Sequence, residues 1–251
     1  MRDSMSLLKT SRKYHKWLMA FIGMQFVIWS FTGAYMVFIN IDYIHGDTLV
    51  NNAQDKIDPQ EIKYPLQTLL QQHPGAADIK LGRYLDKHVY RFKLTDKKVL
   101  IDASNGQIIP SLSREQAEHA AQYYYTGTGD IDSSELFSEH APFDLNPAAL
   151  PAWQVNFTDF GSPTIYVSAE TGLLMGKRHD FWRLFDWMFR FHVMDYDKGE
   201  IDNSLLFWFT LLGILSSIFG LVLVYFRVFR KEAADLTPPT ANKNNNLEGA
   251  A

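Results

Sequence analysis

The stretch YRFKLTDKKVLIDASNGQIIP, residues 90–110, recurs in outline as WQVNFTDFGSPTIYVSAETGLLMG, residues 153–176. When the copies are aligned on Gly106 and Gly172, both contain alternating apolar residues, a Thr-Asp pair and a glycine turn, and the second has a longer loop. Alternation with a period of two, interrupted by such turns, predicts antiparallel strands. We therefore expect each copy to form a strand, a turn, a second strand and a glycine turn.

A helical pattern precedes each copy. Residues 59–72 begin with a proline behind a cap at Asp58, and residues 113–125 begin with Ser-Arg-Glu-Gln, the pattern of a capping box. The sequence thus predicts an α+β domain of two units, residues 48–110 and 111–176. Each unit should contain a helix and an antiparallel sheet, and the two should pack sheet to sheet or pseudo-symmetrically.

Corresponding positions in the two units are expected to be buried alike. Phe92 and Leu94 should be as buried as Val155 and Phe157, which occupy the matching places in the second copy. A charge placed at Leu94 should then prevent folding, because a buried unpaired charge costs on the order of several kcal/mol.

Two long segments, residues 17–41 and 204–226, contain no Asp, Glu, Lys, Arg or His. Each exceeds the about 20 residues that a helix needs to cross the hydrocarbon core of a bilayer. A cleaved signal peptide has a shorter apolar core of about 7 to 15 residues and ends at small residues, whereas the first segment ends in Phe-Ile-Asn-Ile. The sequence predicts a membrane protein with two transmembrane helices, the first of them uncleaved.

Basic residues gather outside both spans, in residues 1–16 and directly after residue 226. By the positive-inside rule we expect both termini in the cytoplasm and the central domain in the periplasm, with the protein in a bacterial inner membrane. Residues 231–251 are poor in apolar side chains and are expected to be disordered. The net charge of −4 argues against a nucleic-acid partner, and the absence of cysteine excludes disulfides and thiolate metal sites.

Several motifs resemble the PepSY-associated transmembrane helix (PepSY-TM) family. In chain order they are Lys13-Tyr14-His15-Lys16-Trp17, Thr32-Gly33, Arg190-Phe191-His192 and Ser217-Ile218-Phe219-Gly220-Leu221. The repeated segments that end at Gly106 and Gly172 resemble the PepSY module itself, with Ser168 in the place of Asp102. The resemblance covers residues 12–230 and implies a two-span member with tandem periplasmic PepSY-like repeats. Larger members with reductase activity have four or more spans.

Residues 179–197 have an amphipathic, strongly aromatic pattern. A helix of this kind beside a span belongs at the membrane interface, where tryptophan favours the headgroup level. The residues expected at that interface are Trp182, Phe185, Trp187 and Phe189. The alternative is a docking surface for a partner or a cofactor.

Small residues recur at a spacing of four in the second span, which lets two helix backbones approach closely. The pairs are Gly213 with Ser217 and Ser216 with Gly220, and the first span offers Ser30 and Ala34 as counterparts. The contact joins either the two spans of one chain or two copies in a homodimer. Gln25, in the middle of the first span, should face another helix because an unpartnered amide in the membrane is costly.

The resemblance also implies haem b, because related ferric siderophore reductases bind haem within their helices. The candidate ligands are His15, His45 and His192. About 30 Å of bilayer separates His15 from the other two. Within one chain only His45 and His192 are expected at one level, whereas a homodimer supplies a second copy of each. Headgroup contacts, hydrogen bonds to helix ends and simple packing are the alternative roles.

The sequence contains no phosphate-binding glycine loop, no HExxH and no GxSxG. From the resemblance we expect a non-catalytic accessory subunit that binds a membrane or periplasmic protein partner in an electron-transfer or iron-uptake system, such as ferric siderophore reduction. A haem-containing electron-transfer component is the first alternative. A membrane-tethered inhibitor or regulator of a periplasmic protease is the second.

Overall fold

The computed structural model describes residues 2–51, 56–95, 97–196 and 203–229 of the 251-residue chain. The chain divides into two compact units. The helical unit comprises Met1–Ala34 with Arg190–Ala251, and the α/β unit comprises Tyr35–Phe189. The predicted disordered tail, residues 231–251, lies outside the described residues.

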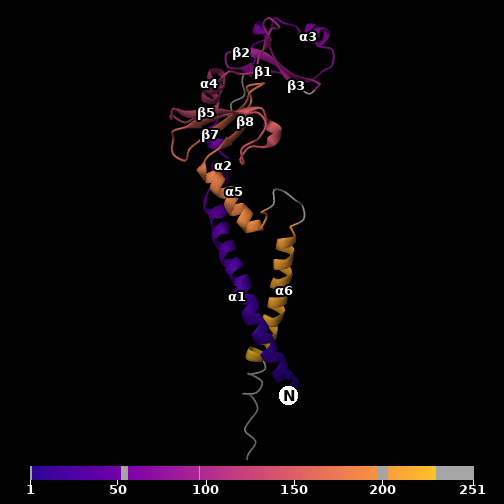
Figure 1. Cartoon of the computed structure of the whole chain (residues 1–251), viewed down its shortest axis with the longest axis vertical. Helices are drawn as coiled ribbons and strands as arrows, with labels where there is room; N and C mark the ends of the chain where they lie inside the picture. Colours follow the sequence, from indigo (N-terminus) through magenta and orange to yellow (C-terminus); the bar gives the residue numbers. More distant parts are fainter. Residues whose placement is uncertain (1, 52–55, 96, 197–202, 230–251) are drawn as a thin grey trace, which may run out of the picture. The chain divides into compact units, whose positions relative to one another are not determined.

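Two long helices dominate the described part of the helical unit (Figure 1). They are α1 (Arg2–Phe38) and α6 (Ser204–Val224), and α6 continues into the π-helical turn η4 (Tyr225–Phe229). Among the described residues, Met5–Phe38 and Ser204–Phe229 are long and apolar enough to cross a membrane. The first helix ends before the predicted limit at residue 41, because the side chain of Asn40 accepts hydrogen bonds from the first backbone amides of the next helix.

Two aromatic stacks show that α1 and α6 run antiparallel. The rings of Tyr14 and Phe219 lie 5.8 Å apart, and those of Phe21 and Phe209 lie 5.1 Å apart. A later position on α1 therefore meets an earlier position on α6. This direction is the one required of two successive spans of one chain.

The α/β unit is built from two four-stranded antiparallel sheets, and the predicted α+β class is confirmed. The first module has the sheet order β1-β2-β3-β4 and the second module the order β5-β6-β7-β8. The first module contains η2 (Pro59–Glu61), α3 (Leu66–Gln72), β1 (Ala76–Tyr84), β2 (Lys87–Leu94), β3 (Lys97–Asp102) and β4 (Ile108–Ile109). The second contains α4 (Arg114–Tyr124), β5 (Ile131–Phe137), η3 (Pro147–Ala149), β6 (Ala152–Phe157), β7 (Thr164–Ser168) and β8 (Leu174–Arg178). The short helices α2 (Ile41–Ile44) and η1 (Asp47–Leu49) precede the modules, and α5 (Asp180–Val193) follows them.

The predicted helix over residues 59–72 is wrong in its first half. A 3₁₀ turn, η2, is followed by an extended segment, and the α-helix begins only after Pro65. Proline has no backbone N–H and disfavours the helical conformation in the residue before it. The N–H groups of Lys63 and Tyr64 donate instead to the carbonyl of Ala103, at 3.1 and 2.9 Å, so this segment is tied to the sheet.

The second helix, α4, has the predicted start. The Ser113 hydroxyl accepts from the backbone of Gln116, and the Gln116 side chain accepts from the backbone of Ser113. Strand β5 was not predicted, because it lies in a polar stretch in which Ser134 is the only buried residue. Strand β8 was also missed, since it begins two residues after Gly172 and no sequence pattern separates it from that turn.

The two modules share one core, to which α4 and both sheets contribute, and Arg91 of β2 also donates directly to the Thr171 carbonyl of the second module. Ala117 and Ala121 of α4 belong to one core cluster with Leu100 of the first sheet and Val155 of the second. The opposite face of the first sheet packs on α3, while Tyr166 on the opposite face of the second sheet packs on the loop before β6. The order of layers is α3, first sheet, α4 and second sheet (Figure 1). The small side chains of α4 allow both sheets to approach it.

Three of the four compared core positions are buried as expected. Phe92, Val155 and Phe157 are 3, 0 and 3% exposed. Leu94 is only half-buried, because it ends strand β2 at the edge of the cluster that covers α3. The prediction that a charge at Leu94 prevents folding is therefore not supported, and Phe92 is the position at which that experiment should be made.

Candidate functional site

The two modules close their sheets with the same hydrogen-bonded turn. The Gly106 N–H donates to the Asp102 carbonyl at 2.8 Å, and the Gly172 N–H donates to the Ser168 carbonyl at 3.0 Å. Both glycines have positive φ, 75° and 65°, which favours glycine. The Asp102 carboxylate accepts from the Ser104 backbone at 2.8 Å, and the Ser168 hydroxyl accepts from the Thr171 backbone at 3.2 Å. Ser168 thus accepts a backbone hydrogen bond within the second turn, as Asp102 does within the first.

A tyrosine ring covers each of these glycines. Tyr64 lies against Gly106, and Tyr84 lies against Gly172, so closely that a Cβ at either position would collide with the ring. Tyr84 belongs to the first module and Gly172 to the second. The turn of the second module is therefore part of the interface between the two modules.

The Thr-Asp pair of the second copy closes another loop. Asp159 accepts hydrogen bonds from the Tyr125 hydroxyl at 2.6 Å and from the backbone of Gly129 and Thr128 at 2.7 and 3.1 Å. These bonds, that from Tyr125 foremost, hold the pKa of Asp159 below its usual value. The corresponding Asp96 lies outside the described residues.

The first module has an open polar pocket of about 640 Å³ beside its glycine turn. The pocket lies where η2, the turn between β1 and β2, and the end of β3 meet. Its lining residues are Asp58, Gln60, Glu61, Lys63, Asp86, Lys87, His88, Asp102, Ser104 and Asn105. Four carboxylates and two ammonium groups therefore face one cavity, which makes it net negative.

His88 forms the buried wall of this pocket and is 6% exposed. Its Nδ1 lies 2.7 Å from a Glu61 carboxylate oxygen, and its Nε2 accepts a hydrogen bond from the Asp58 backbone at 3.1 Å. Because Nε2 accepts, the proton is on Nδ1 and is donated to Glu61. His88 thus fixes η2 against strand β2 and keeps the Glu61 carboxylate at the pocket.

Asp102 is the most buried carboxylate of the pocket, at 7% exposed. Burial alone would raise its pKa, but hydrogen bonds from the side chain and backbone of Ser104 and the nearby Lys87 ammonium lower it below the usual value. The carboxylate is therefore ionised at neutral pH. The ammonium of Lys87 lies 3.8 Å from its second oxygen, and the Lys87 side chain is 64% exposed.

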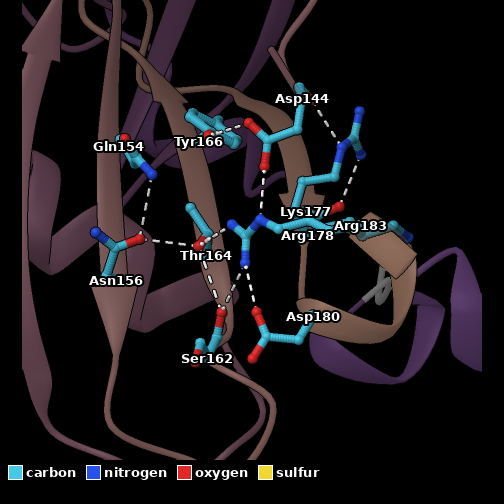
Figure 2. Close-up of polar contacts among 10 residues, drawn as sticks. All are labelled: Asp144, Gln154, Asn156, Ser162, Thr164, Tyr166, Lys177, Arg178, Asp180 and Arg183. Carbon is cyan, nitrogen blue, oxygen red and sulfur yellow. Dashed lines mark hydrogen bonds and ion pairs between the residues drawn. The ribbon is translucent and has the colours of Figure 1, made fainter. Parts of the chain in front are cut away.

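A second polar cluster fastens α5 to the second sheet (Figure 2). Arg183 of α5 lies 3.1 Å from a carboxylate oxygen of Asp144, whose other oxygen accepts from the Tyr166 hydroxyl at 2.7 Å. Arg183 also donates to the Thr164 hydroxyl at 2.9 Å and to Asp180 at 3.1 Å. Burial, together with the bond to Asp144, raises the pKa of Tyr166. The start of α5 is thus part of the folded α/β unit.

Arg178, next to this cluster, contacts Trp182, one of the residues predicted to lie at the membrane interface. Its guanidinium donates to the Asp144 carbonyl at 2.8 Å and lies 4.1 Å from the ring centroid of Trp182. Burial lowers the pKa of Arg178. Trp182 and Phe185 are half-buried, whereas Trp187 and Phe189 are 51 and 47% exposed. Trp187 and Phe189 thus expose a larger share of their rings than Trp182 and Phe185 do.

His179, which sequence reasoning did not single out, is 2% exposed at the start of α5. Its Nε2 donates to the Tyr43 carbonyl at 2.7 Å, and its Nδ1 has no hydrogen-bond partner in the described chain. Burial holds its pKa below the usual value. Its position directly before the aromatic helix α5 is the sequence feature that could have drawn attention to His179.

In the helical unit, His15 lies against α6. Its Nδ1 is 3.0 Å from the carbonyl oxygen of Ser216, so Nδ1 donates. A Cβ at Gly220 would lie 3.1 Å from the His15 ring, so this glycine makes room for the imidazole. In the neutral ring the hydrogen bond leaves Nε2 with a free lone pair.

His192 has the same arrangement against α1. Its Nδ1 lies 2.9 Å from the Thr32 hydroxyl, which donates its own proton to the Ile28 carbonyl at 2.8 Å and therefore accepts from Nδ1. A Cβ at Gly33 would lie 3.3 Å from the His192 ring. In the neutral imidazole Nε2 carries the lone pair, and among the described residues it has no hydrogen-bond partner.

Each of these two histidines has the geometry of a single haem ligand. A histidine ligand typically donates one ring N–H to a protein acceptor and binds the metal through the other nitrogen, as both geometries allow. The structure does not bring the two together, because Thr32, the partner of His192, and His15 are 17 residues apart on α1, or about 25 Å at the rise of a helix. His45 belongs to the α/β unit, where it ends α2 with its side chain exposed. In the described part of the chain, no three His, Asp or Glu side chains form a metal site.

The predicted small-residue pairs of α6 lie on different faces. Ser216 is 1% exposed and, with Gly220, faces His15, whereas Ser217 is exposed and a Cβ at Gly213 would meet nothing within 4 Å. In the antiparallel register of α1 and α6, Ser216 and Gly220 meet His15 and not the predicted counterparts Ser30 and Ala34. Gln25 is 7% exposed, and its amide nitrogen has no partner in the described residues.

Comparison with known proteins identified no relative of this chain. No family model, no curated protein and no solved structure matches it.

Proposed function

We propose that this chain is a two-span protein of a bacterial inner membrane whose α/β unit, on the periplasmic side, binds a cationic segment of a protein partner. It acts as a non-catalytic accessory subunit of an electron-transfer or iron-uptake system, such as one that reduces ferric siderophores. The membrane assignment is supported by the two helices of sufficient length and hydropathy. The system is inferred from the resemblance of its motifs to the PepSY-TM family.

The observation that carries the binding role is the difference between two otherwise equivalent turns. Ser168 accepts the backbone hydrogen bonds of its turn with a neutral hydroxyl, so the turn does not need the charge of Asp102. Pro151 takes the place of His88, because its carbonyl accepts from Ala169 as the His88 carbonyl accepts from Ala103. Two of the polar residues of the pocket, Asp102 and His88, are therefore specific to the first module, and the equivalent turn of the second module folds without them.

The sign of the pocket indicates its ligand. Four carboxylates surround it against two lysines, and Asp102 is ionised and nearly buried. A lysine or arginine side chain, or the amino terminus of a partner, would gain charge-assisted hydrogen bonds there. Because a span precedes the α/β unit in the chain and another follows it, a partner bound to this unit would be retained at the membrane.

The test is photo-crosslinking of the full-length protein in its native membrane. A photoreactive amino acid at Gln60, on the pocket, should give a discrete crosslinked species, and the same residue at exposed Glu139 of the second module should not. The charge reversal Asp86→Lys should remove the crosslink, whereas Glu135→Lys, an equal change on β5, should preserve it. Equal crosslinking at both positions, or no effect of Asp86→Lys, would contradict the proposal.

A haem-containing electron-transfer component is the second candidate, because two imidazoles beside the spans each keep Nε2 free. His192 and His15 would each hold a separate haem b, which would supply one-electron chemistry when bound. For each haem, a further protein ligand would come from another copy of the chain or from a partner. The purified protein from haem-replete cells should then show a Soret band that shifts on reduction, and a colourless protein would reject this candidate.

A further inference from the structure

A cavity of about 430 Å³ lies between the beginning of α1 and the end of α6, within the helical unit. Its walls are three apolar side chains, Leu8, Leu223 and Phe226, and two arginines, Arg12 and Arg227. Its size is within the usual range of small-molecule sites, about 300–1,000 Å³. It is separate from the histidines and from the pocket of the first module.

The end of α6 forms one wall of this cavity. The helix changes from α to π geometry over Tyr225–Phe229, which includes both Phe226 and Arg227. A π-helical turn is wider than an α turn and often occurs at functional sites. Arg227 of this turn and Arg12 of α1 line the same cavity, and no anion from the described residues joins the two guanidinium groups there.

Two guanidinium groups at one cavity repel each other unless an anion lies between them. In the part of the chain that the structure describes, neither Arg12 nor Arg227 takes part in an ion pair. Arginine binds phosphate with two parallel hydrogen bonds, and two arginines can hold one phosphate from both sides. The polar half of the cavity therefore fits a phosphate.

The depth of the two arginines in the membrane fits the phosphate of a lipid. Arg12 lies five residues before the uncharged segment 17–41, which is about 7 Å along a helix. Arg227 directly follows the uncharged segment 204–226. The headgroup layer of a bilayer is about 5–7 Å thick on each side of the hydrocarbon core. The apolar wall of Leu223 and Phe226 continues from this level into the core, where an acyl chain would lie.

We infer that Arg12 and Arg227 form a binding site for one anionic phospholipid, with the phosphate between the guanidinium groups and an acyl chain along Leu223 and Phe226. Basic pockets between transmembrane helices are known to bind anionic lipid headgroups in this way. The site does not depend on the partner or on haem.

Native mass spectrometry of the full-length protein in detergent tests the site with phosphatidylglycerol and phosphatidylcholine of the same chain length. The wild type should bind phosphatidylglycerol at least about tenfold more tightly, and Arg12→Gln with Arg227→Gln should abolish this preference. Lys13→Gln with Lys16→Gln removes the same charge from exposed positions outside the cavity and should leave the preference unchanged.

Two further measurements separate the site from its alternatives. Leu223→Trp fills the cavity while both charges remain, and it should weaken phosphatidylglycerol binding in a protein whose circular dichroism is unchanged. Millimolar inorganic phosphate should not displace the lipid. Equal loss in both double variants would show general surface attraction, and displacement by inorganic phosphate would show a free-anion site; either result overturns the proposal.

Discussion

The Nδ1 atom of His192 donates a hydrogen bond to the Thr32 hydroxyl over 2.9 Å, which joins the end of α5 to α1 across 160 positions of sequence. The same hydroxyl donates to the Ile28 carbonyl, so its orientation is fixed by the helix. His15 repeats the pattern against the Ser216 carbonyl, again beside a glycine of the opposite helix. Each imidazole is held in one orientation by a neighbour that could not be read from local sequence.

If haem is bound, loss of His192 should have a larger effect than loss of His45. His192→Ala should remove the haem associated with this end of the spans, because the variant lacks the Nε2 lone pair that would bind the iron there. His45→Ala should abolish the bis-histidine spectrum only if both ligands come from one chain, and should leave it intact in a dimer that uses two copies of His192. Haem content per protein and the low-spin absorption spectrum are the measurements, and normal haem binding without His192 rejects the assignment.

The orientation of His192 gives a finer test. Thr32→Val removes the acceptor of the Nδ1 proton and should lower haem content or shift the reduction potential, whereas Thr32→Ser retains a hydroxyl and should have little effect. Identical spectra and potentials in Thr32→Val and the wild type would mean that the hydrogen bond only packs the two helices together.

Breaking the Asp144 cluster should strongly destabilise the α/β unit. Arg183→Met leaves the Asp144 carboxylate, 2% exposed, without its ionic partner and should cost about 3 kcal/mol of unfolding free energy. Lys177→Met breaks a more exposed pair with Asp47 and should cost less than about 1 kcal/mol. Thermal unfolding monitored by near-ultraviolet circular dichroism compares them, and equal losses would mean that the cluster does not fix α5 to the sheet.

His179 should make the stability of the α/β unit depend on pH. Burial lowers its pKa in the folded state, so the unfolded chain binds the proton more readily. This contribution to stability should be complete above the unfolded pKa of about 6.5 and should be lost as the pH falls from there towards the folded pKa. His179→Gln should reduce the fall in melting temperature between neutral and acidic pH, and His140→Gln, at an exposed position, should not. An unchanged fall in His179→Gln would contradict the assignment.

The two glycines of α6 should respond differently to a larger side chain. Gly220→Leu should disturb the packing of α6 on α1, because a Cβ there already lies 3.1 Å from the His15 ring. Gly213→Leu should leave this packing intact, since nothing lies within 4 Å of its Cβ position. Melting temperatures of the two variants in detergent give the comparison. A larger loss in Gly213→Leu would point to an interface with another chain at that face.

The sequence contained enough to predict two helices long and apolar enough to cross a membrane, the duplicated α+β architecture and the capping box of α4. Local patterns of hydrophobicity, glycine and caps specify these features. The order of layers was not predictable, because it depends on the alanines of α4 meeting two sheets at once. Likewise, Pro65 was readable as a helix breaker, but the tie of the preceding backbone to Ala103 needed the fold.

The candidate sites were predictable only as residue types. His15, His192, Gly220 and Thr32-Gly33 were recognised separately along the chain, but their pairing across helices follows from the antiparallel register. The charged pocket and the arginine cavity escaped notice because their residues are scattered in sequence and individually look like ordinary surface charges.

If two spans hold the α/β unit outside the cytoplasm, the segments before, between and after the spans must lie on different sides of the membrane in a fixed order. A reporter enzyme active only in the periplasm should be active when fused after Gly129, within the second module, and inactive when fused after Ala234. Activity after Ala234 together with inactivity after Gly129 would contradict the account, because it would place the proposed partner-binding pocket in the cytoplasm.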